Sequence, residues 1–114
     1  MRAKKVDRVQ SEIISHLRQN GWRVCLTHVV GGGAPDAFVS RLGFTSALEI
    51  KSGSEAGAEA DLNEAQRRFR DAWKGSFVVA ATPEQAEREL SARLLGFRIE
   101  ELRMAEADLD AGES

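Results

Sequence analysis

The first regular pattern along the chain is an apolar periodicity near the N-terminus. Apolar residues recur at intervals of three and four between Val6 and Leu17, and the pair Asn20-Gly21 follows them. This spacing places the apolar side chains on one face of a helix, and an Asn-Gly pair is typical of a helix end. The pattern therefore predicts an amphipathic helix from Val6 to Gln19.

Strand patterns replace the helical periodicity after this helix. Residues 22–30 are rich in β-branched and aromatic residues and alternate in part between apolar and polar, which predicts a strand. The run Gly31–Pro35 interrupts regular structure, because glycine reaches positive φ and proline has no amide donor. The next two stretches, 36–40 and 44–51, are separated by Leu42-Gly43 and together predict a β-hairpin.

The second half of the chain adds a helix, a strand and a further helix. Leu62–Trp73 is amphipathic and has two candidate N-caps, Asp61 and Asn63. The apolar run Phe77–Ala81 is typical of a buried strand, and Ala86–Leu95 has a helical pattern. The order α-β-β-β-α-β, followed by a last helix, predicts an α/β fold with a mixed β-sheet flanked by helices.

A single domain over residues 1–103 accounts for these elements. The chain has 114 residues, a size at which one hydrophobic core is the rule. Residues 104–114 are acidic and rich in alanine, with few large apolar side chains. We therefore expect this last segment to be a frayed, flexible tail.

Charge and cysteine content indicate which kinds of partner and which cellular compartment to expect. The formal net charge is -2, but residues 1–75 hold 12 basic and 9 acidic residues, whereas residues 76–114 hold 4 and 9. A surface that faces a polyanion is therefore expected in the first part of the chain. The only cysteine, Cys25, excludes an internal disulfide, and no apolar run approaches the roughly 18 residues of a membrane span. We expect a cytoplasmic protein without a membrane segment.

The predicted hairpin brings two acidic residues together. With a two-residue turn at Leu42-Gly43, Asp36 lies directly opposite Glu49. Opposed residues have Cβ atoms about 4.5 to 5.5 Å apart, and like charges there destabilise the sheet, so a bound divalent cation would explain the pair. Side chains alternate along a strand, so Lys51 shares a face with Glu49. The candidate site is therefore formed by Asp36, Glu49 and Lys51.

These residue types suit the hydrolysis of a phosphodiester. Carboxylate and carbonyl oxygens are the ligands of a hard ion such as Mg²⁺, which keeps several waters and leaves room for phosphate oxygens. Such an ion polarises the phosphoryl group and acidifies a bound water. Lys51 is placed to orient that water or to neutralise charge on the phosphorus.

The sequence around this site resembles the PD-(D/E)XK nuclease superfamily, in which Pro35-Asp36 and Glu49-Ile50-Lys51 match the signature. More narrowly, the chain is similar to the small VRR-NUC proteins of phages and bacteria over roughly residues 6–95. The segments that carry this narrower resemblance are Gly31–Asp36, Glu49–Gly53, Leu62–Gln66 and Trp73–Gly75. The resemblance implies a restriction-endonuclease-like fold.

The resemblance also implies a role for individual residues. Asp36 and Glu49 would be metal ligands, the Ile50 carbonyl a further ligand, and Lys51 the catalytic lysine. Gln66 would be a supporting polar residue facing the site, and Glu12 matches an acidic residue that some of these nucleases add to the metal shell from their first helix. The implied cofactor is Mg²⁺ or Mn²⁺ and the implied substrate is DNA, such as a flap or a Holliday junction. Junction-resolving relatives act as dimers, so a homodimer is expected.

A cluster of basic residues follows the candidate site on the helix predicted over residues 62–73. These residues lie on the side opposite its apolar face, where they are available to neutralise phosphates flanking the scissile bond. They are Arg67, Arg68, Arg70 and Lys74.

Simpler interpretations accompany each of these hypotheses. Asp36 and Glu49 are also compatible with a solvated sheet edge, and the basic cluster with an ordinary solvated helix face. Gln66 and Glu12 are both compatible with plain surface positions. For the whole protein, the alternatives to a nuclease are a non-catalytic nucleic-acid-binding or junction-recognition module of the same fold, or a structural subunit of a phage or repair complex.

Overall fold

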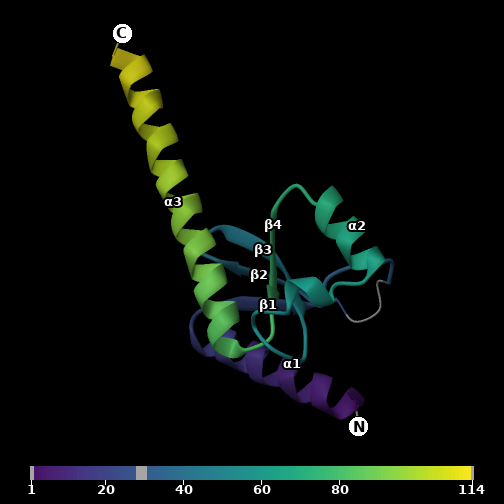
Figure 1. Ribbon diagram of the computed structural model, residues 1–114. Helices are drawn as coiled ribbons and strands as arrows, with labels where there is room; N and C mark the ends of the chain where they lie inside the picture. Colours follow the sequence, from purple (N-terminus) through teal and green to yellow (C-terminus); the bar gives the residue numbers. More distant parts are fainter. Residues whose placement is uncertain (1, 28–30, 114) are drawn as a thin grey trace.

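The computed structural model describes residues 2–27 and 31–113 (Figure 1). The chain forms an α/β fold with the element order that the sequence predicts, apart from one short added 3-10 helix. The elements are α1 (Arg2–Gln19), β1 (Arg23–Leu26), β2 (Ala37–Arg41), β3 (Phe44–Ile50), the 3-10 helix Glu59–Asp61, α2 (Glu64–Ala72), β4 (Ser76–Ala80) and α3 (Pro83–Glu113).

The four strands form one mixed sheet in the order β1-β2-β3-β4. The first three strands are antiparallel to one another, and β4 is parallel to β3. Leu42 and Gly43 form the predicted two-residue turn, with φ of 51° and 81°, and Arg41 pairs with Phe44. Positive φ at both central residues is the geometry that matches the twist of a hairpin. The predicted register of the hairpin is confirmed.

Helices cover the two faces of the sheet unequally. The face that contacts α1 and α3 carries the main hydrophobic core, and α2 packs on part of the other face through Phe69 and Trp73. Figure 1 shows α2 and α3 on opposite sides of the sheet. Members of the main core include Ile13, Leu17, Val39, Leu48, Val78, Leu90 and Leu94.

The last helix is much longer than its predicted extent of Ala86–Leu95. It continues to Glu113 and projects beyond the sheet, and the side chains of residues 98–112 are exposed (Figure 1). The prediction that helical structure stops near Leu95 is wrong, because the segment is rich in strong helix formers and includes an ion pair between Arg98 and Glu101. The flexibility of residues 104–114 stays a prediction.

Two further boundaries differ from the predictions. β1 ends at Leu26, and residues 28–30 of the strand predicted over 22–30 lie outside the described residues. α2 begins only after Asn63, which caps it, so the choice between Asp61 and Asn63 falls to Asn63. None of the described helices is both long and apolar enough to cross a membrane.

Candidate functional site

The two acidic residues of the predicted pair lie at the same end of the sheet. Asp36 directly precedes β2, and Glu49 is the second-last residue of β3. The observed register pairs Ala37 with Leu48, so one further step along the hairpin brings Asp36 opposite Glu49. The backbone amide of Ile50 donates a hydrogen bond of 2.7 Å to Asp36 Oδ2. The hairpin therefore places both carboxyl groups at one point of the sheet.

The loop before β2 holds Asp36 in place. The amide of Thr27 donates to the Asp36 carbonyl oxygen over 3.0 Å, and the Thr27 hydroxyl donates to the carbonyl of the buried Pro35. Gly33 has a φ of +79°, and a Cβ at this position would clash with the backbone of Ala65 in α2. Only glycine allows the loop to approach α2 this closely, so Gly33 contributes to the position of the acid pair.

Glu49 is a buried carboxyl group with one unpartnered oxygen. Its side chain is 4% exposed, and its Oε1 accepts a hydrogen bond of 2.6 Å from Nε2 of Gln66. Its Oε2 is buried and has no hydrogen-bond partner among the described residues. Burial, followed by the nearby charge of Asp36, raises the pKa of Glu49 to about 7, although Lys51 opposes this shift.

Gln66 connects the acid pair to α2. Its backbone amide donates to the Asn63 side chain, and its Oε1 accepts from the Asn63 amide, which forms a capping box at the start of α2. The same Oε1 accepts a hydrogen bond of 2.8 Å from Nζ of Lys51, while Nε2 donates to Glu49. Both polar atoms of the Gln66 side chain therefore form hydrogen bonds, and this side-chain amide orients Lys51 and Glu49.

Lys51 is positioned by these contacts beside Glu49. Its Nζ lies 3.9 Å from Oε1 of Glu49, and its side chain is 18% exposed. Its backbone amide donates to the carbonyl of Ala80 over 2.9 Å, which continues the pairing of β3 with β4. The ammonium group is therefore held at the edge of the site, next to the carboxyl groups and close to solvent.

The oxygens of this site fit a hard divalent cation. The orphaned Oε2 of Glu49 and the carboxyl group of Asp36 are oxygen donors of the kind that Mg²⁺ and Mn²⁺ bind. The N–H and C=O of one strand residue point to the same neighbouring strand, so the Ile50 carbonyl is expected on the side of Asp36. The described residues contain no group of three or more His, Cys, Asp or Glu side chains placed for a metal, so water would complete the coordination.

Glu12 is not brought together with the acid pair. It is exposed on α1 and lines a separate depression with His16 and the start of α3 at Pro83. The one-face pattern of α1 explains this position, because the buried neighbours Ile13 and Ile14 turn Glu12 away from the sheet. The predicted role of Glu12 as a metal ligand has no support from this arrangement.

The basic residues of α2, and Lys74 two residues after its end, lie at the surface, but most of them interact with neighbouring groups. Arg68 pairs with Glu64 one turn earlier, and the guanidinium of Arg67 donates to the Leu62 carbonyl. Arg70 contacts Asp71 at 3.2 Å and Glu59 at 3.6 Å. Lys74 is exposed and pairs with none of the described carboxylates. This face therefore carries less free positive charge than its sequence indicates.

The sequence patterns did not indicate one residue, Glu55, that holds the loop after Lys51 in place. Glu55, in the loop after Lys51, accepts hydrogen bonds from the Thr82 hydroxyl at 2.5 Å and from Arg88 at 2.9 Å. These two bonds lower the pKa of Glu55, and its carbonyl accepts from Gln85 at 3.1 Å. The loop is thereby attached to the start of α3. The only signal in the sequence is the capping pattern from Thr82 to Gln85, which marks the helix start but not its partner.

The chain matches no protein-family model, and searches of curated proteins and of solved structures gave no significant match.

The raised pKa of Glu49 predicts a pH-dependent stability of the metal-free protein. The unfolded chain loses this proton near pH 4.5 and the folded chain near pH 7, so the free energy of unfolding should fall as pH rises between these values. The total loss should be up to about 3 kcal/mol, since each unit of pKa corresponds to about 1.4 kcal/mol. Urea unfolding in EDTA at pH 5 and pH 8 measures it.

Glu49→Gln should remove most of this pH dependence, because an amide cannot titrate and still accepts the bond from Gln66. The matched control is Glu106→Gln on the exposed end of α3, which should keep the parent's pH dependence. If Glu49→Gln and the parent lost the same stability between pH 5 and pH 8, Glu49 would not be the group responsible.

Proposed function

We propose that this protein is a metal-dependent DNA nuclease of the VRR-NUC-like kind, which hydrolyses phosphodiester bonds. The observation that carries the proposal is the buried Glu49 carboxyl group beside Asp36, whose Oε2 has no hydrogen-bond partner within the part of the chain that the structure describes. An ionised Glu49 in this position costs folding energy, because its burial and the nearby charge of Asp36 both oppose its ionisation. A bound divalent cation would offset that cost, because its positive charge stabilises the ionised carboxyl groups.

Each residue of the site then has a defined task. Asp36, Glu49 and the Ile50 carbonyl would hold Mg²⁺ or Mn²⁺, which supplies a polarised phosphoryl oxygen and an acidified water when bound. Gln66 keeps Oε1 of Glu49 in position, which would leave Oε2 available to bind the cation. Lys51 contributes a positive charge beside the reacting phosphate, where negative charge grows during hydrolysis.

The finer properties of the proposed nuclease follow from the family resemblance. Its substrate is DNA, with a flap or a Holliday junction as the candidate structure, and it acts in the cytoplasm. A homodimer would supply two sites for cutting two strands. The alternative of a non-catalytic junction-recognition module is less consistent with the site, because a pure binding surface gains nothing from two carboxyl groups facing phosphate.

A cleavage assay on defined DNA structures tests the proposal. End-labelled flap, four-way junction, duplex and single-stranded substrates are incubated with the protein in Mg²⁺, Mn²⁺, Ca²⁺ or EDTA. Cleavage of at least one substrate is expected in Mg²⁺ or Mn²⁺, with none in EDTA. Binding of these substrates without cleavage under any of these conditions would favour the recognition module, and cleavage that persists in EDTA would contradict the metal site.

A further inference from the structure

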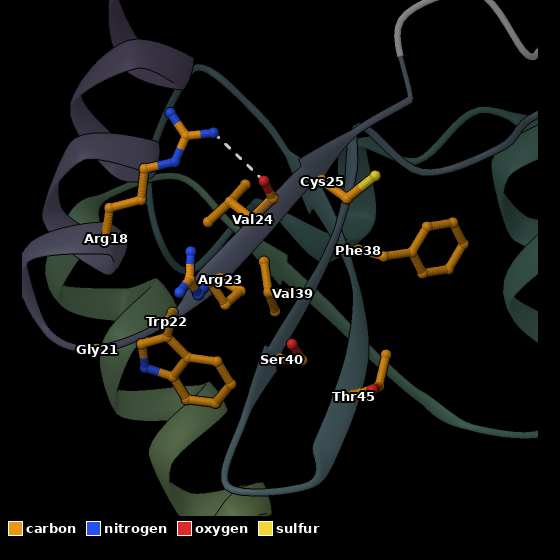
Figure 2. Close-up of a pocket in the computed structure, with 10 residues that line it drawn as sticks. All are labelled: Arg18, Gly21, Trp22, Arg23, Val24, Cys25, Phe38, Val39, Ser40 and Thr45. Atoms are coloured by element: carbon orange, nitrogen blue, oxygen red, sulfur yellow. Dashed lines mark hydrogen bonds between the residues drawn. The ribbon is translucent and has the colours of Figure 1, made fainter.

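A cavity of about 730 Å³ lies at the β1 edge of the sheet. Its walls come from the end of α1, from β1 and from β2, and Figure 2 shows Arg18, Arg23 and Cys25 around it. None of the described lining residues is acidic, although the whole chain has more acidic than basic residues. Its volume is within the range of pockets that bind small ligands or single groups of a larger partner.

Two arginines line this cavity from different elements, and a third lies beside it. Arg18 comes from α1 and Arg23 from β1, and both side chains are exposed. Arg41, at the end of β2, is not part of the lining, but it lies next to the lining residue Gly21, where a Cβ would be 3.2 Å from its Nε. Within the described part of the chain, none of these three arginines pairs with a carboxylate, and Arg18 makes a single bond of 3.3 Å to the Val24 carbonyl.

This cluster differs in charge from the basic face of α2. On α2, Arg68 and Arg70 are paired with carboxylates, whereas Arg18, Arg23 and Arg41 form no ion pair with any carboxylate that the structure describes. Arg guanidinium groups are well suited to phosphate oxygens, because their fixed fork of donors matches two oxygens at once. The cavity therefore offers a stronger site for a phosphate-bearing chain than the helix that the sequence singles out.

The cavity lies on the same strand, β2, that leads to Asp36 of the acid pair. Arg23 pairs with Ser40 of β2, and Ser40 lies four residues, or roughly 13 Å along the strand, from Asp36. Phe38 and Ser40 line the cavity and share the strand face of Asp36. A stacked strand advances about 3.4 Å for each nucleotide, so this distance corresponds to about four nucleotides.

We propose that this arginine-lined cavity binds the phosphate backbone of a single nucleic-acid strand and that the strand follows β2 towards Asp36 and Glu49. The inference deepens the proposed nuclease function and rests on it for the direction of the strand. A flexible single strand can follow a hollow beside an edge strand, and positively charged grooves that track one backbone are typical of single-strand binding.

Binding is measured in EDTA, so that it does not depend on cleavage. A fluorescent 12-nucleotide oligothymidylate is titrated with the parent protein and with the double variant Arg18→Ala/Arg23→Ala. We expect the affinity of the double variant to fall about tenfold, and the slope of log affinity against log salt to fall by about 0.7 for each phosphate that the variant no longer neutralises. The charge-matched control is Arg93→Ala/Arg103→Ala on exposed positions of α3, which should bind like the parent.

The single cysteine gives a second measurement at the cavity itself. Cys25 lines the cavity and is exposed, so its thiol should react with maleimide in the free protein. The 12-nucleotide strand should slow this reaction at least about fivefold, as expected for a site mostly occupied by a bound ligand. Inorganic phosphate at the same phosphate concentration and a 12-base-pair duplex should protect the thiol less.

The outcomes separate this inference from the proposed function. Unchanged affinity and salt slope in the arginine variant, or an equal loss in the control, would overturn the cavity as a strand site. Protection of Cys25 by the duplex or by inorganic phosphate to the same degree would overturn the assignment to a single strand. Strand binding with protection but no cleavage in Mg²⁺ or Mn²⁺ would support the cavity site and contradict the nuclease.

Discussion

Replacement of Asp36 by asparagine should abolish metal-dependent cleavage while the protein stays folded. Asparagine has the same shape and still accepts the hydrogen bond from the Ile50 amide, but it removes the negative charge that a cation needs. Loss of the metal would remove several kcal/mol of transition-state stabilisation, so turnover should fall by about 10³-fold or more. The measurement is the single-turnover cleavage rate in Mg²⁺.

The same substitution should make the metal-free protein slightly more stable at pH 8. The charge of Asp36 raises the pKa of Glu49, so its removal lessens the repulsion between the two carboxyl groups. Thermal unfolding in EDTA measures this effect. The matched control is Asp71→Asn on α2, an exposed residue outside the site, which should keep both cleavage and stability. Cleavage by Asp36→Asn at the parent's rate would remove Asp36 from the proposed metal site.

Replacement of Lys51 by methionine should lower turnover by about 10² to 10³-fold, because the positive charge beside the reacting phosphate is lost. Methionine keeps the apolar stem of the side chain, and the fold should be retained. The affinity for DNA in Ca²⁺ should stay close to that of the parent, because one ammonium that is 18% exposed is a minor part of the binding surface. Single-turnover rates and gel-shift affinities are compared for the same substrate.

The choice of pH and of a control variant separates a catalytic role of Lys51 from its other effects. Lys51 lowers the pKa of Glu49, so its removal favours a protonated Glu49, and the rates are compared at pH 8 to limit this effect. Lys74→Met, on an exposed lysine near the end of α2, is the matched control and should keep its turnover at saturating DNA. If the affinity of Lys51→Met fell in step with its turnover, Lys51 would be a phosphate anchor rather than a catalytic group.

The sequence alone determined the elements whose causes are local. The two-residue turn at Leu42-Gly43 sets the register of the hairpin, and that register brings Asp36 opposite Glu49. Period-two alternation places Lys51 on the same face. For the start of α2 the sequence offered two candidate caps, Asp61 and Asn63, and the structure assigns the cap to Asn63.

The last helix shows where apolar periodicity was insufficient. The apolar periodicity of residues 86–95 reports the part of α3 that packs on the sheet, and it carries no information on the exposed residues beyond it. Helix propensity extends the element to Glu113. For the same reason the position of Glu12 could not be predicted, since an acidic residue on the polar face of a helix has no pattern that ties it to a distant strand.

The tertiary structure decided the properties that arise between distant segments. The burial of Glu49, its raised pKa and its bond to Gln66 depend on the way in which α2 packs against β3, which no spacing in the sequence encodes. Arg18 and Arg23 lie on different elements and have the pattern of unrelated surface charges in the sequence, yet the tertiary structure brings both to one cavity. Local interactions are encoded by neighbouring residues, whereas desolvation and electrostatic potential are sums over everything that the fold places nearby.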